Sequence, residues 1–126
     1  MSKEFSLSDL DASIGGAKLF EFEYTFKNGK GSGVFLSILG AESEEVARET
    51  AALMAAERAK QEFDGEKYKF DANELGKRLA AIRIKAWRGI KEECTPENAL
   101  KLCLSNKEVA DQVIKHSDNF GNFIRL

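Results

Sequence analysis

The sequence predicts an α+β fold, in which an N-terminal β-hairpin precedes a mainly helical body of three to four helices. Aromatic residues alternate with polar ones between Phe20 and Phe26, glycines crowd residues 28–33, and apolar residues recur at helical spacing beyond Ser43. With 126 residues, 43% of them hydrophobic, the chain is expected to be one domain with its own core. We divide it into a flexible leader (1–16), the hairpin (17–40), the helical body (42–118) and a tail (119–126).

The leader is expected to be mobile and to end at Gly15-Gly16. The hairpin after it is predicted because apolar and polar residues alternate with a period of two. The apolar members of the first strand are all aromatic, and they alternate with Glu21, Glu23 and Thr25, which is typical of a strand with one buried face. Asn28-Gly29 indicates a turn because both residues tolerate positive φ, and residues 34–39 form a second β-prone run. A hairpin alone is marginal in water, so it must pack on helices or pair with another chain.

The first long helix is predicted to begin after Ser43, which can cap it, and to end at Asp64-Gly65. Alanine is frequent between residues 47 and 59 and has the best helix propensity. A possible apolar stripe consists of Val46, Leu53, Ala56 and Phe63. Tyr68 and Phe70 then fall in a polar connector.

Further helices are predicted downstream. One runs from about Ala72 to Arg88 and stops at Gly89; its apolar face comprises Leu75, Leu79, Ile82 and Ala86, widened by Ile84 and Trp87. Another starts at Thr95-Pro96, where threonine caps and proline occupies the first helical position. The last begins at Ser105–Glu108, which has the spacing of a capping box.

The residues give no sign of an enzyme. His116 is the only histidine, and we expect it near the end of the last helix, where an imidazolium interacts well with the helix dipole. The glycine loop at 28–33 leads into a strand rather than a helix, so it is read as a turn and not as a phosphate-binding loop. Cys94 and Cys103, both placed in predicted helix, are expected to be free thiols. No catalytic residue, metal or cofactor is therefore expected.

Charge is distributed unevenly along the chain. Residues 72–91 contain six bases (Lys77, Arg78, Arg83, Lys85, Arg88, Lys91) against Glu74, whereas residues 41–71 contain nine acids against five bases. A basic 77–91 helix is compatible with a small nucleic-acid-associated protein. We favour a solvated face that pairs with the acidic helix of the same or a neighbouring subunit, because the net charge of the whole chain is −2.

Three motifs carry a family resemblance: Ala86-Trp87-Arg88-Gly89-Ile90, Thr95-Pro96-Glu97-Asn98-Ala99-Leu100-Lys101-Leu102 and Asn119-Phe120-Gly121-Asn122-Phe123. With the stretch from Gly33 to Ser43, they resemble the tail assembly chaperones of long-tailed bacteriophages. That family typically shows a tryptophan-bearing helix end, a Pro-x-Asn-Ala-Leu helix start and a terminal Asn-Phe pair. This chain departs from the family at Cys94-Thr95, where relatives often have an aromatic residue and a serine.

The resemblance implies a non-enzymatic protein that binds the tape-measure protein and keeps it soluble. It also implies that the chain helps tail-tube subunits to assemble, self-associates, acts in the host bacterial cytoplasm and is not retained in the mature virion. The sequence shows neither a signal peptide nor an apolar run long enough for a membrane. The candidate partner-binding residues are Trp87, Phe120, Phe123, Lys77, Arg78 and Arg88, although the two phenylalanines could instead fold back onto the core.

Overall fold

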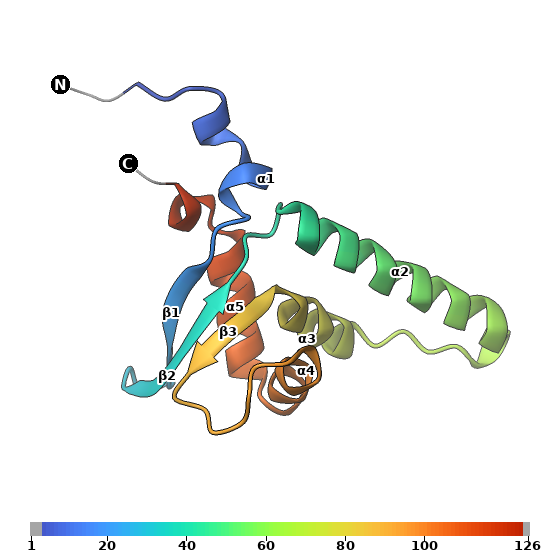
Figure 1. The fold of residues 1–126 in the computed structure, drawn as a ribbon. Helices are drawn as coiled ribbons and strands as arrows, with labels where there is room; N and C mark the ends of the chain where they lie inside the picture. The colour runs from blue at the N-terminus through green and yellow to red at the C-terminus, as the bar shows by residue number, and fades with distance from the viewer. Residues whose placement is uncertain (1–3, 125–126) are drawn as a thin grey trace.

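A three-stranded antiparallel sheet and a group of helices form the body of the molecule, from which one long helix projects (Figure 1). The computed structural model describes residues 4–124; the remainder of the predicted leader (1–3) and tail (125–126) lies outside the described residues. The sheet has the order β1 (Phe20–Thr25), β2 (Gly31–Ile38), β3 (Ile84–Arg88). The helices are α1 (Ala12–Gly15), α2 (Glu44–Asp64), α3 (Ala72–Arg83), α4 (Pro96–Ser105) and α5 (Lys107–Asp118). The predicted α+β class is confirmed.

The predicted hairpin is β1 and β2. Phe22 and Tyr24 of β1 are buried, and Leu36 and Ile38 of β2 are completely inaccessible to solvent. Gly29, with φ of 86°, lies in the turn between the strands. Helices α3, α4 and α5 supply the rest of the core, chiefly Ala80, Ala81, Ala99, Cys103, Val109, Ala110 and Val113.

The predicted helix from Ala72 to Arg88 is wrong in its last part. Helix α3 ends at Arg83, and the next five residues form β3, with Ile84 opposite Ile38 and Trp87 opposite Leu36. Between residues 82 and 86 apolar residues alternate with the charged Arg83 and Lys85, which also satisfies a strand. The open edge of β2 provides backbone partners, so pairing there overrides the local helical pattern. Gly89 therefore ends a strand instead of a helix.

Helix α2 begins and ends where the sequence predicts. The Ser43 side chain accepts a hydrogen bond from the backbone N–H of Val46 at 3.2 Å, and Gly65 follows the last turn with φ of 56°. The expected apolar stripe does not enter the core, however. Val46 is the only buried residue of the helix, and Phe63 is 92% exposed. The helix leaves the body after its first turns, and we refer to residues 50–71, its outer part with the following connector, as the arm (Figure 1).

Two predictions around α4 and α5 need correction. Thr95 caps α4 as expected, with Pro96 in the first turn, but Cys94 precedes the helix and only Cys103 is helical. Helix α5 is capped by Asn106, whose side-chain oxygen accepts a hydrogen bond from Val109 N, and Ser105 is the last residue of α4. Because only one residue separates the two helices, the cap shifts from Ser105 to Asn106.

Both ends of the described chain are more ordered than predicted. Residues 8–10 form a 3₁₀ turn and α1 follows, so the leader is not uniformly unstructured. The backbone N–H of Gly40 donates to the carbonyl of Gly16 at 2.8 Å, which joins the end of the leader to the body. In the tail, Phe120–Phe123 form another 3₁₀ turn, which packs against α1. No helix between residues 4 and 124 is long and apolar enough to cross a membrane.

Candidate protein-binding surfaces

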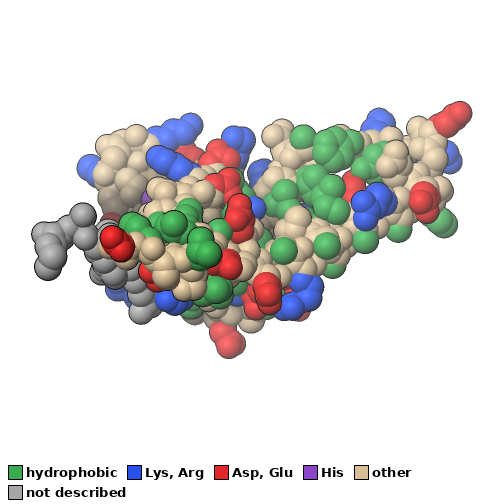
Figure 2. All heavy atoms as spheres, turned by 90° about the horizontal axis from the view of Figure 1, so that it is seen from above, with side chains coloured by type: hydrophobic (Ala, Val, Ile, Leu, Met, Phe, Trp, Pro, Cys, Tyr) green, Lys and Arg blue, Asp and Glu red, His purple; other side chains and the backbone are tan. Residues whose placement is uncertain are grey.

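Most of the exposed large apolar side chains fall in two regions of the molecule, and the others are Phe26 after β1 and Leu104 in α4. One region is the N-terminal segment: Phe5, Leu7, Leu10, Ile14 and Leu19, which are 44–92% exposed. The other is the arm, where Phe63 and Phe70 are 92% and 59% exposed. Figure 2 shows hydrophobic side chains gathered over the N-terminal turns and along α2. Grouped exposed apolar side chains of this size mark protein-binding surfaces more often than isolated ones do.

The five N-terminal side chains, which we call the N-terminal apolar face, are presented by locally fixed backbone. Asp9 Oδ2 accepts a hydrogen bond from the backbone N–H of Ser6 at 2.9 Å. Asp11 caps α1, accepting from the hydroxyl and the N–H of Ser13 at 2.6 and 2.9 Å. These hydrogen bonds lower the pKa of Asp11, and the bond from the Ser13 hydroxyl has the largest effect. The two turns thus hold the segment in a defined shape with its apolar side chains in solvent.

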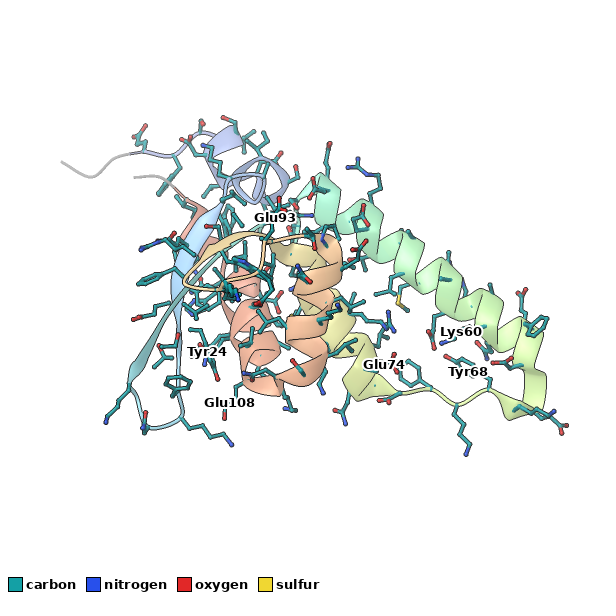
Figure 3. All side chains as sticks on the ribbon, turned by 60° about the horizontal axis from the view of Figure 1, so that its bottom comes forward. Tyr24, Lys60, Tyr68, Glu74, Glu93 and Glu108 are labelled. Atoms are coloured by element: carbon teal, nitrogen blue, oxygen red, sulfur yellow. The ribbon has the colours of Figure 1, made fainter. Side chains whose placement is uncertain are left out.

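Within the arm, Tyr68 fastens the connector to helix α2. Its hydroxyl donates to Glu57 Oε1 at 2.5 Å, and Figure 3 shows the Tyr68 ring beside α2 near Lys60. The hydrogen bond to the carboxylate, aided by desolvation, raises the pKa of Tyr68 to about 12. A phenol is protonated at neutral pH even at its ordinary pKa of about 10, so Tyr68 acts as a proton donor there, and the raised pKa extends this to more alkaline pH. The later part of α2 is thus paired with its connector. Phe63 lies at the far end of this helix.

A groove opens where α2 leaves the body. Its volume is about 340 Å³, within the range of roughly 300–1,000 Å³ that is usual for binding pockets. It lies between α2, α3, β3 and the start of α4, and most of its wall is apolar. The lining residues are Glu49, Leu53, Arg78, Ala81, Ile82, Ile84, Lys85, Cys94, Thr95, Pro96 and Leu100. The Lys85 ammonium forms an ion pair with Glu45 Oε2 at 2.5 Å beside it.

The predicted site residues are not brought together. Trp87 lies on β3, half-buried against the core, and its indole N–H donates to the Glu92 carbonyl at 2.8 Å. Arg88 lies over the Phe35 ring at 3.8 Å and donates to Glu21, which lowers the pKa of that carboxyl. Trp87 therefore stabilises the sheet, and Arg88 acts on its opposite face.

The tail aromatics are not exposed anchors. Phe123 is only 5% exposed and belongs to the core, while Phe120 is half-buried against it. The Phe123 ring meets Phe20 edge-on at 5.9 Å. The alternative in which these residues fold back onto the body is the one that the structure adopts.

The basic residues of 77–91 do not form one helical face, because the helix ends within that segment. Arg78 pairs with Glu74 and Lys77 donates to the carbonyl of Leu104. The other ion pairs of this segment are Arg83–Asp118, Lys85–Glu45 and Arg88–Glu21. Only the Lys85 pair joins the basic segment to the acidic one, so the expected pairing with the acidic helix is mostly replaced by other partners. The basic residues are divided among several elements, and four of them form an ion pair with an acidic residue.

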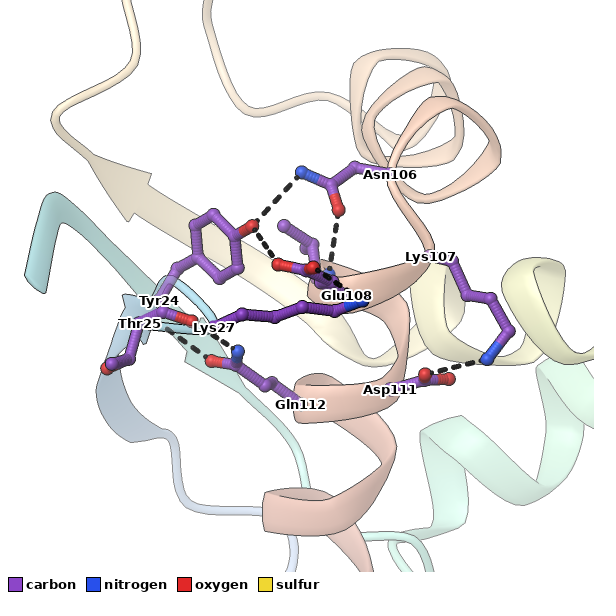
Figure 4. Close-up of polar contacts among 9 residues, drawn as sticks. Tyr24, Thr25, Lys27, Asn106, Lys107, Glu108, Asp111 and Gln112 are labelled. Carbon is purple, nitrogen blue, oxygen red and sulfur yellow. Dashed lines mark hydrogen bonds and ion pairs between the residues drawn. The ribbon is translucent and has the colours of Figure 1, made fainter. Parts of the chain in front are cut away.

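Polar contacts that sequence reasoning missed fasten β1 to α5 (Figure 4). The Tyr24 hydroxyl donates to Glu108 at 3.0 Å. Gln112 accepts from the Thr25 N–H at 3.1 Å and donates to its carbonyl at 2.6 Å, which satisfies a strand residue that has no strand partner on that side. These pairs lie more than 80 residues apart in the sequence, so no local pattern signals them. They are structural contacts at the strand edge.

His116 is also placed among core contacts. Its ring stacks on Phe22 with centroids 4.2 Å apart, and desolvation followed by the charge of Lys115 lowers the pKa of the imidazole. The expected imidazolium at the helix end is thus disfavoured. Between residues 4 and 124, no group of three His, Cys, Asp or Glu side chains is arranged to hold a metal ion.

The thiols differ in environment. Both cysteines are free; Cys103 is buried and Cys94 is half-buried at the groove. Desolvation raises the pKa of Cys94 and raises that of Cys103 to about 12. Neither is therefore activated as a thiolate nucleophile.

Nothing matches this chain among protein-family models, curated proteins or solved structures.

Proposed function

We propose that the chain is a tail assembly chaperone of a long-tailed bacteriophage, which binds the tape-measure protein in the host cytoplasm and keeps it soluble. The observation that carries the proposal is the N-terminal apolar face, five large apolar side chains held in solvent within residues 5–19. A small protein gains nothing in stability from apolar side chains left in water, so such a face is best explained by a partner that covers it. The resemblance of residues 79–123 to this family names the partner.

A tape-measure protein would offer an apolar helical surface that complements the N-terminal apolar face. A long helical tape-measure protein exposes apolar stripes before the tail tube encloses it, and such a helix can lie along an apolar face through residues spaced at i, i+3, i+4 and i+7. By covering these stripes the chaperone would prevent aggregation and hold the tape-measure protein ready for tube subunits. Loss of the chaperone as the tube forms would leave it out of the mature virion.

Co-expression with the tape-measure protein of the same phage tests the proposal. The wild-type chain should keep that protein in the soluble fraction and be recovered with it on purification. The triple variant Leu7→Gln, Leu10→Gln, Ile14→Gln should fold normally, as judged by circular dichroism and thermal melting, yet leave most of the tape-measure protein in the pellet. The matched control is Phe63→Gln with Phe70→Gln, which removes exposed apolar side chains from the arm and should retain activity.

Two outcomes would count against the proposal. One is a tape-measure protein that stays insoluble with the wild-type chain. The other is binding of the chain to DNA with a steep dependence on salt, which would favour the nucleic-acid alternative because phosphate contacts release counterions. A triple variant as active as wild type would move the binding surface away from the N-terminal apolar face.

A further inference from the structure

Acidic side chains border the N-terminal apolar face and a hollow beside it. We propose that this surface binds preferentially a helix whose apolar stripe is flanked by lysine or arginine residues, with one apolar side chain of that helix seated in the hollow. The inference rests on the proposed function for the identity of the partner, the tape-measure protein. It adds the chemistry that the bound segment of that partner must have.

The hollow lies between α1 and the first turn of α2, and its volume is about 430 Å³. Its apolar walls are Ile14, Ala17 and Leu39. Ile14 belongs to the N-terminal apolar face and is 51% exposed, whereas Leu39 is buried. The hydrogen bond from Gly40 N–H to the Gly16 carbonyl joins the two sides. The hollow therefore continues the apolar face towards the core, where it offers a place for an apolar side chain.

Glutamates of α2 line the same hollow. They are Glu44 and Glu45, in the first turn of the helix. The charge of Glu45 is matched by its ion pair with Lys85. Glu44 and its neighbour Glu42 are exposed, and neither forms an ion pair with another residue between 4 and 124. These two carboxylates are free to interact with a partner.

The charge of the whole surface is negative. Residues 4–19 and 40–45 contain one base, Lys18, and six acids: Glu4, Asp9, Asp11, Glu42, Glu44 and Glu45. If Lys85 and Arg48, which lies one turn beyond Glu44, are added, the six acids still exceed three bases. The positive end of the α2 dipole contributes only about half a charge. Figure 2 shows acidic side chains beside the hydrophobic ones over the N-terminal turns.

The sign of this charge distinguishes between possible partners. Nucleic acids and anionic lipid headgroups are themselves negative, so this surface repels them. A helix with lysine or arginine on both sides of an apolar stripe would cover the apolar centre and bring its positive charges to the acidic border. Charges at the border of an interface mainly set specificity and the rate of association. Glu42 and Glu44 are therefore expected to determine which helices bind.

Binding of synthetic helices to the isolated full chain tests the inference. Three alanine-rich helical peptides would carry the same leucine stripe, bordered by lysine, by glutamine or by glutamate. At about 50 mM salt the lysine-bordered peptide should bind about tenfold more tightly than the glutamine-bordered one, and most of this difference should disappear at about 500 mM salt. The glutamate-bordered peptide should bind most weakly of the three.

Variants of the chain separate the acidic border from the apolar centre. Glu42→Gln combined with Glu44→Gln should weaken binding of the lysine-bordered peptide by about 3- to 10-fold and leave the glutamine-bordered one unchanged. The matched control, Glu62→Gln with Glu66→Gln, removes the same charge from the arm and should affect neither peptide. Ile14→Gln should weaken both peptides to a similar degree, because it removes an apolar contact. Thermal melting shows that each variant is folded.

Three outcomes would overturn the inference. They are equal affinity for the lysine-bordered and glutamine-bordered peptides, a Glu42→Gln, Glu44→Gln chain that binds the lysine-bordered peptide as wild type does, and an equal loss in the arm control. Each would leave the proposed function in place if the wild-type chain keeps the tape-measure protein soluble. A chain that prefers the lysine-bordered peptide and leaves that protein insoluble would instead support the preference of this surface and contradict the proposed function.

Discussion

At the residue scale, His116 lies between aromatic rings of β1. Its ring centroid is 4.2 Å from that of Phe22 and 5.8 Å from that of Phe20. Protonation would place a charge in this partly desolvated position, beside the like charge of Lys115, and these two effects lower the pKa of the imidazole in that order. The stacking therefore depends on the neutral form of the ring.

This lowered pKa predicts a loss of stability in mild acid. In the unfolded chain the pKa of the imidazole is about 6.5, so the stabilising contribution of the neutral ring is complete above that pH. Below it the unfolded state binds the proton first, and the contribution is lost as the pH falls through the folded pKa. Urea denaturation at about pH 7.5 and 5.5 should show a smaller fall in the free energy of unfolding for His116→Phe than for wild type. Equal falls in both proteins would assign the pH dependence to other groups.

Ion pairs show which residue-scale features the sequence cannot predict. The Arg78–Glu74 pair is spaced i, i+4 on one helix and could be read from the sequence. The Arg88–Glu21 pair joins residues 67 positions apart, and its existence depends on the order of strands in the sheet. Both partners there are well exposed, so the pair sets the direction of the side chains more than it stabilises the fold.

At the element scale, the caps and the hairpin could be predicted because their causes are local. Ser43 and Thr95 cap helices by bonding to an N–H three residues later, which requires nothing from the rest of the chain. The change from α3 to β3 could not be predicted in the same way. The residues around Ile84 fit both a helical and an alternating pattern, and the free edge of β2 decides between them. Trp87 was consequently assigned to the wrong element.

The end of β3 provides a matched pair of glycine substitutions. Gly89 has φ of 89°, and a Cβ there would overlap the carbonyl oxygen of Gly33. Gly89→Ala should therefore lower the free energy of unfolding by about 2–4 kcal/mol, through left-handed strain and displacement of β2. Gly76, inside α3, has no atom within 4 Å of an added Cβ. Gly76→Ala should instead raise stability by about 0.5–1 kcal/mol through better helix propensity.

Urea denaturation of the two variants and of the wild type tests both predicted changes in the free energy of unfolding, the decrease and the increase. A neutral Gly89→Ala would mean that the β2–β3 contact is loose enough to accommodate a methyl group. A destabilising Gly76→Ala would mean that the surface of α3 at this position is covered.

At the scale of the whole molecule, the sequence predicted most of the elements, β3 excepted, but not where they lie. Apolar residues at helical spacing in α2 predicted a face directed to the core, and the same pattern serves an arm that leaves it. Alanine contributes to this ambiguity because it favours a helix whether it is buried or exposed. The candidate tail anchors failed for a related reason: the buried Phe123 ring packs against Phe20 of β1 and lies next to Gly40, both far from it in the sequence. Packing between distant segments decides both cases.

The arm is expected to be less stable than the rest of the molecule. Beyond Val46 the side chains of α2 are half-buried or exposed, so the arm can open without disturbing the core. We therefore predict that trypsin, at low protein concentration, cuts first within residues 58–69, at Arg58, Lys60, Lys67 or Lys69, before any site in 72–118. Mass spectrometry identifies the sites. A first cut in 72–118 would contradict this division of stability.

The same experiment links the arm to the sheet. Strand β2 lies before the cut and β3 after it, and the two are paired, so the nicked fragments should elute together on native size exclusion and separate only in denaturant. Fragments that part without denaturant would show that pairing of β2 with β3 does not survive loss of the covalent link.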